Sequence, residues 1–280
     1  MTRYGRLALQ RIATGALVVA GLAASPGQAV TETSRSDVAK NIAASMAQSA
    51  ELSSTVYSAH VWRGQVRNRS TALHTTLTTK PHPALILGGN ALVDASRRDA
   101  ATGTLVSTAE LSIFYMAPPF GPLKAGIGLV ERLYPGTTTK VPEDGPPPFD
   151  RKRATEGVLT LNLRSFLAPY VDAYLDLRNP ERLYTALGLG HLWLLTPELP
   201  TMEIAASLAF ANAAYNQAQF ALDQAALNDG VVSLLLRKEV DPSNSIILEL
   251  TYSRMLDQRL RSALDTPDRL YGGIGWEVRF

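Results

Sequence analysis

Histidines are the side chains on which hydrolytic chemistry would depend, and the chain has only four: His60, His74, His82 and His191. A serine nucleophile needs a histidine base, which a third polar group orients. On one β-strand, the serine and the histidine would stand two positions apart, so that both face the same side. None of the four histidines has a serine two residues after it, and only His60 follows Ser58 in the inverted order. We therefore predict that the protein is not an enzyme.

The sequence does not indicate a metal or cofactor site either. Four scattered histidines do not form a cluster of metal ligands. The chain contains no cysteine, which excludes a disulfide framework, a cysteine-based metal site and a lipid anchor on cysteine. We predict that the protein binds no metal and no cofactor.

Charged side chains at alternate positions of apolar segments are the stronger candidates for a function. In LAPYVDAYLDLR, Asp172 and Asp176 alternate with Val171 and Leu175, which gives one polar and one apolar face. The same reasoning in the other segments predicts an interior set that carries both signs of charge. Its basic members are Arg63, Lys124, Arg164, Arg237 and Arg279, and its acidic members are Glu110, Glu156, Asp172, Asp176, Glu249 and Glu277.

The elements that position these charges are segments of about ten residues with period-two alternation, separated by clusters of Pro, Gly, Asn and Asp. About ten residues is the length that a tilted strand needs to cross a bilayer, and single-chain bacterial barrels have an even number of strands. We therefore predict an all-β fold, a transmembrane antiparallel up-and-down β-barrel of about 12 strands. The segments are 55–66, 70–79, 84–95, 104–116, 122–132, 153–164, 167–178, 183–194, 201–214, 229–240, 244–254 and 269–280.

The connections between these segments differ in length on the two sides of the predicted barrel. Transmembrane barrels have short periplasmic turns and longer outer loops. With a periplasmic N-terminus, the three longest connections, 133–152, 215–228 and 255–268, all fall on the outer side, and every periplasmic connection is short. The first of these, rich in proline, is either a constriction folded into the barrel or a surface loop. A soluble all-β sandwich is the alternative fold.

The C-terminal sequence YGGIGWEVRF predicts a membrane-facing strand. Ile274, Trp276, Val278 and Phe280 fall on one side of it, and Glu277 and Arg279 belong to the other. A barrel pairs its last strand with its first, so this strand has no free edge. Phe280 would lie in the aromatic girdle against outer-membrane lipid. The alternating apolar residues with a terminal aromatic also resemble the signal that the barrel-assembly machinery recognises.

The N-terminal region predicts export. Residues 1–29 carry three arginines, then an uncharged stretch and a small-residue site, which is the layout of a secretory signal peptide. Cleavage of the signal peptide would remove those three arginines and leave 24 of the 27 basic residues, against 25 acidic ones. The mature chain would then be close to neutral, so no nucleic-acid partner is expected. We predict that residues 30–53 form a linker or a short helix. This segment would be a periplasmic tether, a plug of the barrel or a disordered linker. The barrel is predicted over 54–280, in the outer membrane of a Gram-negative cell.

The stretch STVYSAHVWRGQ, with Tyr57, Trp62, Arg63 and Gly64, resembles the opening strand of an uncharacterised family of secreted bacterial outer-membrane barrels. Members begin with a Tyr-rich strand that ends in W-R-G, and the similarity loosely covers residues 55–280. The resemblance implies a porin-like fold and an outer-membrane location, and it implies no activity. His60 shares a face with Trp62, which departs from a clean lipid-facing pattern.

The predicted function is that of a porin-like channel for small polar solutes. The interior charges would form either separate ladders that leave a narrow water-filled path or interleaved pairs that close the barrel. The second arrangement leads to the alternative function, a non-conducting barrel that presents its outer loops to partners. A lipid hydrolase comes third. Twelve is also the strand count of the outer-membrane phospholipase, but this chain lacks that enzyme's His-x-Ser pair with its neighbouring Asn. Solute identity and oligomeric state are not specified by the sequence.

Overall fold

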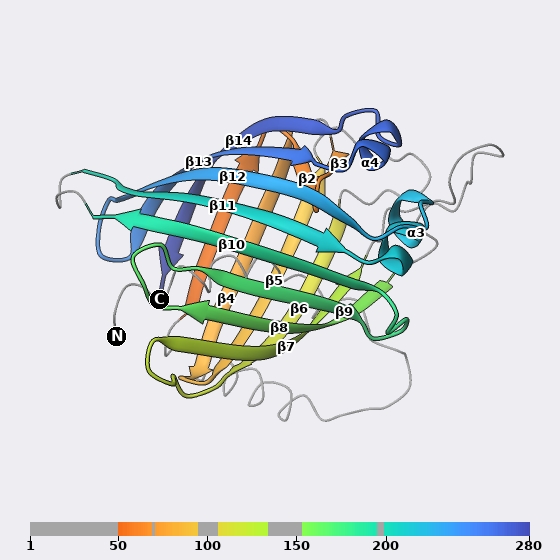
Figure 1. Ribbon diagram of the computed structural model, residues 1–280. Coiled ribbons are helices and arrows are strands. Elements are labelled where there is room, and N and C mark those ends of the chain that lie inside the picture. The colour runs from red at the N-terminus through yellow and green to blue at the C-terminus, as the bar shows by residue number, and fades with distance from the viewer. Residues whose placement is uncertain (1–49, 69–70, 95–105, 134–152, 195–198) are drawn as a thin grey trace, which may run out of the picture.

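In the computed structural model, residues 50–68, 71–94, 106–133, 153–194 and 199–280 are described. Their main feature is one closed antiparallel barrel of 12 strands, in which each strand pairs with its neighbours in the barrel order (Figure 1). The predicted fold class and strand number are confirmed. The strands are β1 (Ala50–Tyr57), β4 (Ala72–His82), β5 (Leu85–Asp94), β6 (Val106–Met116), β7 (Leu123–Leu133), β8 (Arg153–Leu163), β9 (Tyr170–Asp176), β10 (Leu183–Trp193), β11 (Thr201–Ala211), β12 (Ala226–Glu239), β13 (Asn244–Met255) and β14 (Asp268–Arg279).

The first predicted strand, 55–66, is wrong. The barrel strand β1 begins at Ala50, within the segment assigned to the linker, and ends at Tyr57. The chain then forms a separate hairpin of β2 (His60–Trp62) and β3 (Gln65–Asn68). Arg63 and Gly64 form its turn with φ values of 47° and 75°, the left-handed region that two-residue hairpin turns use. The alternation continues through residues 60–66 because a hairpin strand has the same period as a barrel strand.

The barrel closes between its first and last strands, as predicted from the C-terminal alternation. β1 pairs with β14 over seven residue pairs, from Glu51 opposite Arg279 to Tyr57 opposite Gly273. The Phe280 N–H donates to the Ala50 carbonyl oxygen at 2.9 Å, which extends the seam past the end of β14. The terminal strand therefore has hydrogen-bonded neighbours on both sides, β1 and β13.

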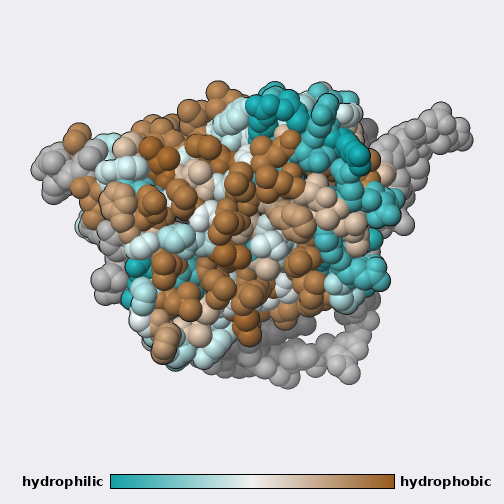
Figure 2. Space-filling view, viewed as in Figure 1, coloured by the Kyte–Doolittle hydropathy of each residue, from teal (hydrophilic) through white to brown (hydrophobic). Residues whose placement is uncertain are grey.

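The outward faces of the strands carry large apolar side chains, as the alternation predicts. Exposed fractions reach 60% for Ile127, 57% for Leu187 and 50% for Leu208. Hydrophobic residues spread across the barrel wall, and hydrophilic residues gather at the end where the helices lie (Figure 2). Neither helix of the described residues has the length and hydropathy of a membrane span. An apolar exterior of this kind suits lipid rather than water.

The four residues of the predicted girdle occupy this exterior at the C-terminal end of the wall. Ile274, Trp276 and Phe280 are 59%, 43% and 69% exposed, and Val278 is partly buried between them. The Trp276 indole N–H donates to Asn244 Oδ1 at 3.0 Å, which is the amphipathic arrangement expected of a tryptophan at a membrane interface.

The connections are short at the end of the barrel where Phe280 lies. The longest of these, at residues 117–122, 164–169 and 194–200, have six or seven residues, against as many as 19 at the opposite end, at residues 134–152. In the turn between β12 and β13, Asp241 accepts hydrogen bonds from the Asn244 side-chain amide at 2.9 Å and the Ser243 N–H at 2.8 Å. These bonds lower the pKa of Asp241. The two ends thus differ as the predicted periplasmic and outer sides do.

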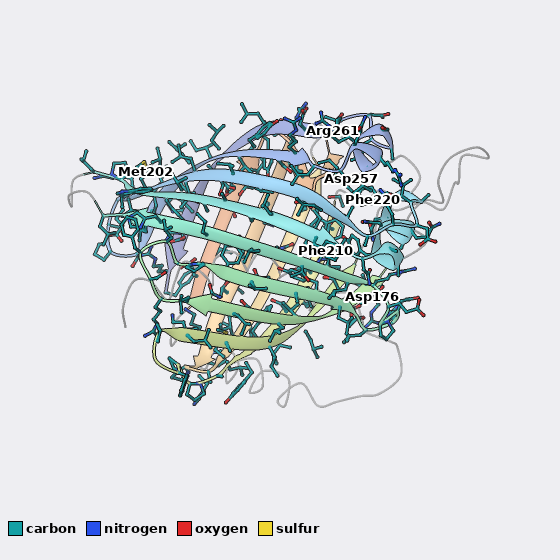
Figure 3. All side chains as sticks on the ribbon, in the orientation of Figure 1. Asp176, Met202, Phe210, Phe220, Asp257 and Arg261 are labelled. Carbon is teal, nitrogen blue, oxygen red and sulfur yellow. The ribbon has the colours of Figure 1, made fainter. Side chains whose placement is uncertain are left out.

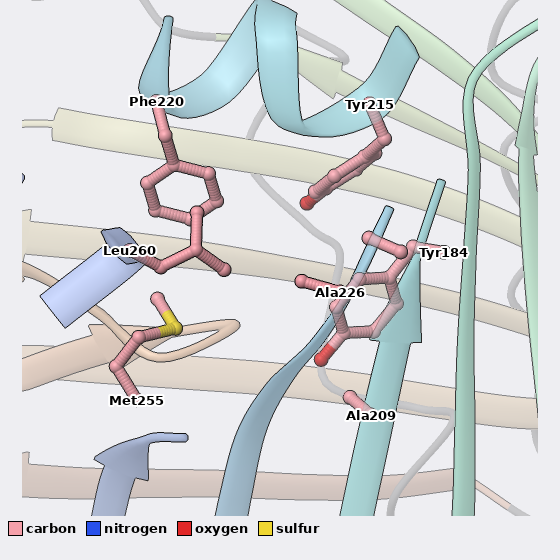
Figure 4. Packing of buried hydrophobic residues seen from close by; sticks show 8 residues of the cluster. Tyr184, Ala209, Tyr215, Phe220, Ala226, Met255 and Leu260 are labelled. Atoms are coloured by element: carbon pink, nitrogen blue, oxygen red, sulfur yellow. The ribbon is translucent and has the colours of Figure 1, made fainter. Parts of the chain in front are cut away.

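Two short helices lie at the long-loop end. Helix α3 (Ala213–Phe220) lies in the connection between β11 and β12. Helix α4 (Gln258–Ser262) follows β13. Phe220, Leu260 and Met255 pack beside Tyr184 in one buried apolar cluster (Figure 4). Asn216 and Asn228, both fully buried, exchange amide hydrogen bonds at 2.8 and 3.2 Å and fix α3 to β12. The loop at α3 is therefore attached to the barrel wall.

Candidate functional site in the barrel lumen

Four charged side chains form one ion-paired group at the long-loop end of the lumen, which we call the outer charge cluster: Arg63, Glu110, Arg132 and Glu156. Arg63 donates from its two terminal nitrogens to the two oxygens of Glu156, both at 2.8 Å. Arg132 also donates to Glu156, and its Nε donates to Glu110 Oε2 at 2.5 Å. The side chains are between 7% and 11% exposed. Two positive and two negative charges therefore balance in a site nearly closed to water, as buried charges require.

The guanidinium of Arg63 also lies among aromatic rings. Its Cζ is 4.5 Å from the ring centre of Tyr174, 4.4 Å from that of Tyr184 and 5.6 Å from that of Tyr215. The Trp62 ring centre is 4.5 Å away on the hairpin itself. Distances below about 6 Å are favourable for a cation over an aromatic face. The hairpin β2–β3 thus places a cation inside the barrel, against its wall.

A second group, the inner charge cluster, lies at the end where the chain terminates. It consists of Glu51, Arg237, Glu239, Glu277 and Arg279. Glu277 is fully buried and pairs with Arg237 at 2.7 Å and with Arg279 at 2.8 Å. Arg279 also approaches Glu239 at 3.5 Å and Glu51 at 3.8 Å. Three carboxylates face two guanidiniums, so this cluster has a net negative formal charge.

Between the two clusters, the lumen is lined by hydrogen-bonding side chains. The Tyr57 hydroxyl donates to Glu249 Oε2 at 2.8 Å, and Thr251 donates to Glu249 Oε1 at 3.0 Å. The rings of His74 and Tyr271 lie 6.0 and 6.4 Å from the Tyr57 ring. Glu249 therefore faces the interior, as the alternation of β13 predicts.

The remaining predicted interior residues divide into two groups. Asp172 is buried in β9, and Lys124 is half-buried on the inward side of β7. Asp176 lies at the rim near α3, where it accepts from Arg182 at 3.4 Å (Figure 3). Arg164 is predicted as an interior residue of a strand, and this placement in a strand is wrong. Because β8 ends at Leu163, Arg164 is an exposed residue of the following turn.

Some residues that shape the site were missed. Arg132 joins the two glutamates of the outer charge cluster, and it stands eight residues after Lys124, so it shares the inward parity of β7. That signal was available in the alternation. Tyr184 has the inward parity of β10, but its approach to Arg63 depends on the hairpin, and Tyr215 lies on helix α3, where strand parity gives no signal.

The charges interleave rather than separate into ladders. Arg132 lies between glutamates of the two neighbouring strands, and Glu277 lies between Arg237 of β12 and Arg279 of its own strand. Of the two arrangements predicted for the lumen, the described residues therefore show the paired one.

His82, His191 and Ser58 each have hydrogen-bond partners of their own. His82 accepts from the Ala84 N–H in a turn at 3.2 Å, and His191 Nδ1 lies 2.6 Å from the Phe166 carbonyl oxygen. Ser58, the residue two before His60, accepts from the Gly272 N–H at 3.2 Å. Within the described residues, no three His, Asp or Glu side chains are grouped as a metal site.

No family model matches the chain, and no curated protein matches it. Solved structures similar to it include the NanC porin, at 9% identity and a TM-score of 0.48 over 82% of this chain and 98% of that one. OmpF of Salmonella typhi, in complex with daunomycin, matches at 10% identity and 0.39 over 83% and 96%. The outer-membrane channel DcaP of Acinetobacter baumannii matches at 8% identity and 0.39 over 83% and 95%. The assignment of this chain to a closed barrel rests on its own strand pairing.

Proposed function

We propose that the protein is an outer-membrane, porin-like channel for small polar solutes, narrowed at its outer side by the hairpin β2–β3. The observation that carries the proposal is the contrast between the two faces of the wall. Leu187, Ile127 and their neighbours cover the outside, whereas the inside presents charges of both signs at its two ends. A polar interior within an apolar exterior is the arrangement of a channel across a lipid bilayer.

The location follows from the same features. The exposed band of apolar residues suits outer-membrane lipid, and Phe280 with its alternating apolar neighbours suits recognition by the barrel-assembly machinery. The signal peptide predicted at 1–29 lies outside the described residues, as do residues 30–49 of the linker predicted at 30–53, and both remain part of the proposal. So does membership of the outer-membrane barrel family with the W-R-G box.

A non-conducting barrel is the second candidate, and one observation favours it. Arg63 and the interleaved charges occupy the lumen at its outer end, where they are almost entirely buried. In that case, the outer loops would supply the function by binding partners. The two candidates differ in one measurable property, which is the passage of ions.

Replacing the hairpin residues 60–68 by a short Gly-Ser link should open the outer end of the lumen and raise single-channel conductance severalfold. β1 and β4 are paired directly below the hairpin, so the wall is retained. The measurement is current through planar bilayers, with heat-modifiable migration on gels to confirm folding. Steady steps from the variant, and smaller ones from the native protein, support the channel. Silence from both folded proteins rejects it and favours the non-conducting barrel.

Arg237→Ala should increase the preference of the channel for cations. Removing this positive charge leaves Arg279 to face three carboxylates in the inner charge cluster. The effect should be greatest at low salt, where screening is weakest. The measurement is the reversal potential across a KCl gradient. Arg254→Ala is the matched control, because Arg254 is exposed on an outward position of β13 and should leave the potential unchanged. An unchanged reversal potential in Arg237→Ala would remove the inner charge cluster from the conduction path.

A further inference from the structure

The geometry points to a binding site for guanidinium-bearing solutes in the barrel wall, which Arg63 fills as an internal ligand. We define the wall cage as Glu156, Tyr174, Tyr184 and Tyr215. We propose that a small guanidinium solute competes with Arg63 for the wall cage and thereby releases the hairpin β2–β3. This inference rests on the proposed channel function for its consequence, but the binding itself can be tested without measuring current.

The first support is the fit of the wall cage to a planar cation. Glu156 receives two parallel N–H donors from Arg63 at 2.8 Å each, which is the forked geometry that a guanidinium makes and an ammonium does not. Tyr174 and Tyr184 approach the same carbon at 4.5 and 4.4 Å, and the Tyr215 hydroxyl accepts from Arg63 at 3.2 Å. The cage therefore selects both the charge and the planar shape of its occupant.

The second support is the origin of the cage residues. They belong to β8, β9, β10 and α3, and none belongs to the hairpin. Each has contacts that do not involve Arg63, and the Tyr174 ring lies 6.1 Å from the Tyr184 ring. Tyr184 donates to Asp229 at 2.9 Å, and Glu156 keeps its bond from Arg132. The Tyr215 N–H donates to the helix cap Asn212 at 3.0 Å. The cage thus remains formed when Arg63 leaves, and a preorganised site binds with less ordering cost.

The third support is the manner in which Arg63 enters the cage. It is the tip of a two-residue turn, and its φ of 47° is uncommon for a residue other than glycine. Next to it, a Cβ on Gly64 would come within 2.8 Å of Asp229 Cβ, so only glycine lets the turn sit this close to the wall. Because the hairpin tethers Arg63, its effective concentration at the cage is in the millimolar range or above, and a free solute must compete with it.

The test is isothermal titration of the folded barrel in detergent with methylguanidinium, and with methylurea as a neutral probe of similar shape. Arg63→Ala vacates the cage, so this variant should bind methylguanidinium roughly tenfold more tightly than the native protein, or more. Methylurea should not bind measurably, because it lacks the charge that Glu156 and the rings require. Equal affinity of the variant and the native protein, or equal binding of both probes, would overturn the proposal.

Second-site variants locate the binding. In the Arg63→Ala background, Glu156→Gln should abolish binding of methylguanidinium, and Tyr174→Leu should weaken it severalfold by removing one ring. Glu131→Gln in the same background is the control, since Glu131 lies on β7 beside Arg153 and Thr155 and outside the cage. Tyr174→Leu keeps the test decisive if the Glu156 variant does not fold. Undiminished binding in the folded cage variants would place the site elsewhere.

The proposed channel function and the proposed binding site can be rejected independently of each other. A barrel that binds methylguanidinium in the Arg63→Ala variant, yet passes no current with or without residues 60–68, rejects the channel and retains the cage. A conducting barrel that binds no methylguanidinium in the Arg63→Ala variant rejects the cage and retains the channel.

Discussion

Glu156→Gln should lower the free energy of unfolding by about 3–5 kcal/mol, the range for breaking a buried ion pair. One carboxylate serves both Arg63 and Arg132, and all three side chains are at most 9% exposed. The amide retains the shape of the side chain but removes its charge, so two guanidiniums remain in a site with little water. Glu110 would then be the one carboxylate of the outer charge cluster left to balance the two guanidiniums. The measurement is urea unfolding from lipid vesicles, followed by tryptophan fluorescence.

Glu131→Gln is the matched control for that experiment. Glu131 also forms an ion pair with an arginine of the neighbouring strand, Arg153. Arg153 is 57% exposed, and the pair lies on the outward-facing side of the barrel wall. An exposed pair contributes only about 0–1 kcal/mol, so this variant should be nearly as stable as the native protein. If the two variants lost equal stability, the outer charge cluster would contribute no more than a surface ion pair does.

Gly128→Ala should have the next largest effect, a destabilisation of about 1–3 kcal/mol from overpacking. A Cβ on Gly128 would lie 2.3 Å from Cδ1 of Phe114 and 2.8 Å from the carbonyl oxygen of Ile113. Phe114 is buried, at 2% exposure, in a cluster with Val130 and Val158, so its ring has little room to move. The glycine is thus the place where β7 accommodates an aromatic ring from β6. The same urea titration measures the loss.

Gly230→Ala supplies the comparison. A Cβ there would meet its nearest atom, Leu208 Cδ2, at 3.4 Å, which is an ordinary contact, and the expected change in stability is small. Phe114→Leu combined with Gly128→Ala should recover part of the loss, because the smaller side chain relieves the closest contact. Equal behaviour of the two single alanine variants would show that the ring of Phe114 moves aside without cost.

Much of the barrel is predictable because the side chains of a membrane-spanning strand alternate between apolar and polar with a period of two residues, and because such a strand has a nearly fixed length. Eleven of the strands agree with their predicted segments to within a few residues at each end, and residues such as Glu249 and Glu277 face inward as their parity requires. Ends of strands are less well specified. Arg164 was misplaced because inward parity has no meaning one residue beyond the end of β8.

The pairing of the charges could not be predicted. Parity says which side of the wall a residue faces, but the stagger between strands decides which residues meet. Glu110 and Arg132 are directly opposite in register, whereas Arg63 reaches Glu156 only because a hairpin turns inward after β1. The alternation of residues 60–66 does not distinguish that hairpin from a continued barrel strand. The sequence therefore predicts W-R-G in the first barrel strand, whereas it belongs to the hairpin and its turn.

The seam between β1 and β14 has a consequence for the order in which the molecule acquires its structure. Its contacts join residues more than 200 positions apart, such as Glu51 and Arg279 or Ala50 and Phe280. Contacts so distant in the chain are slow to form, because a long loop must close before they stabilise anything. Closure of the seam cannot begin before the last strand has been synthesised. Until the seam closes, β1 lacks its partner β14, and an unpaired edge strand is open to pairing with other chains.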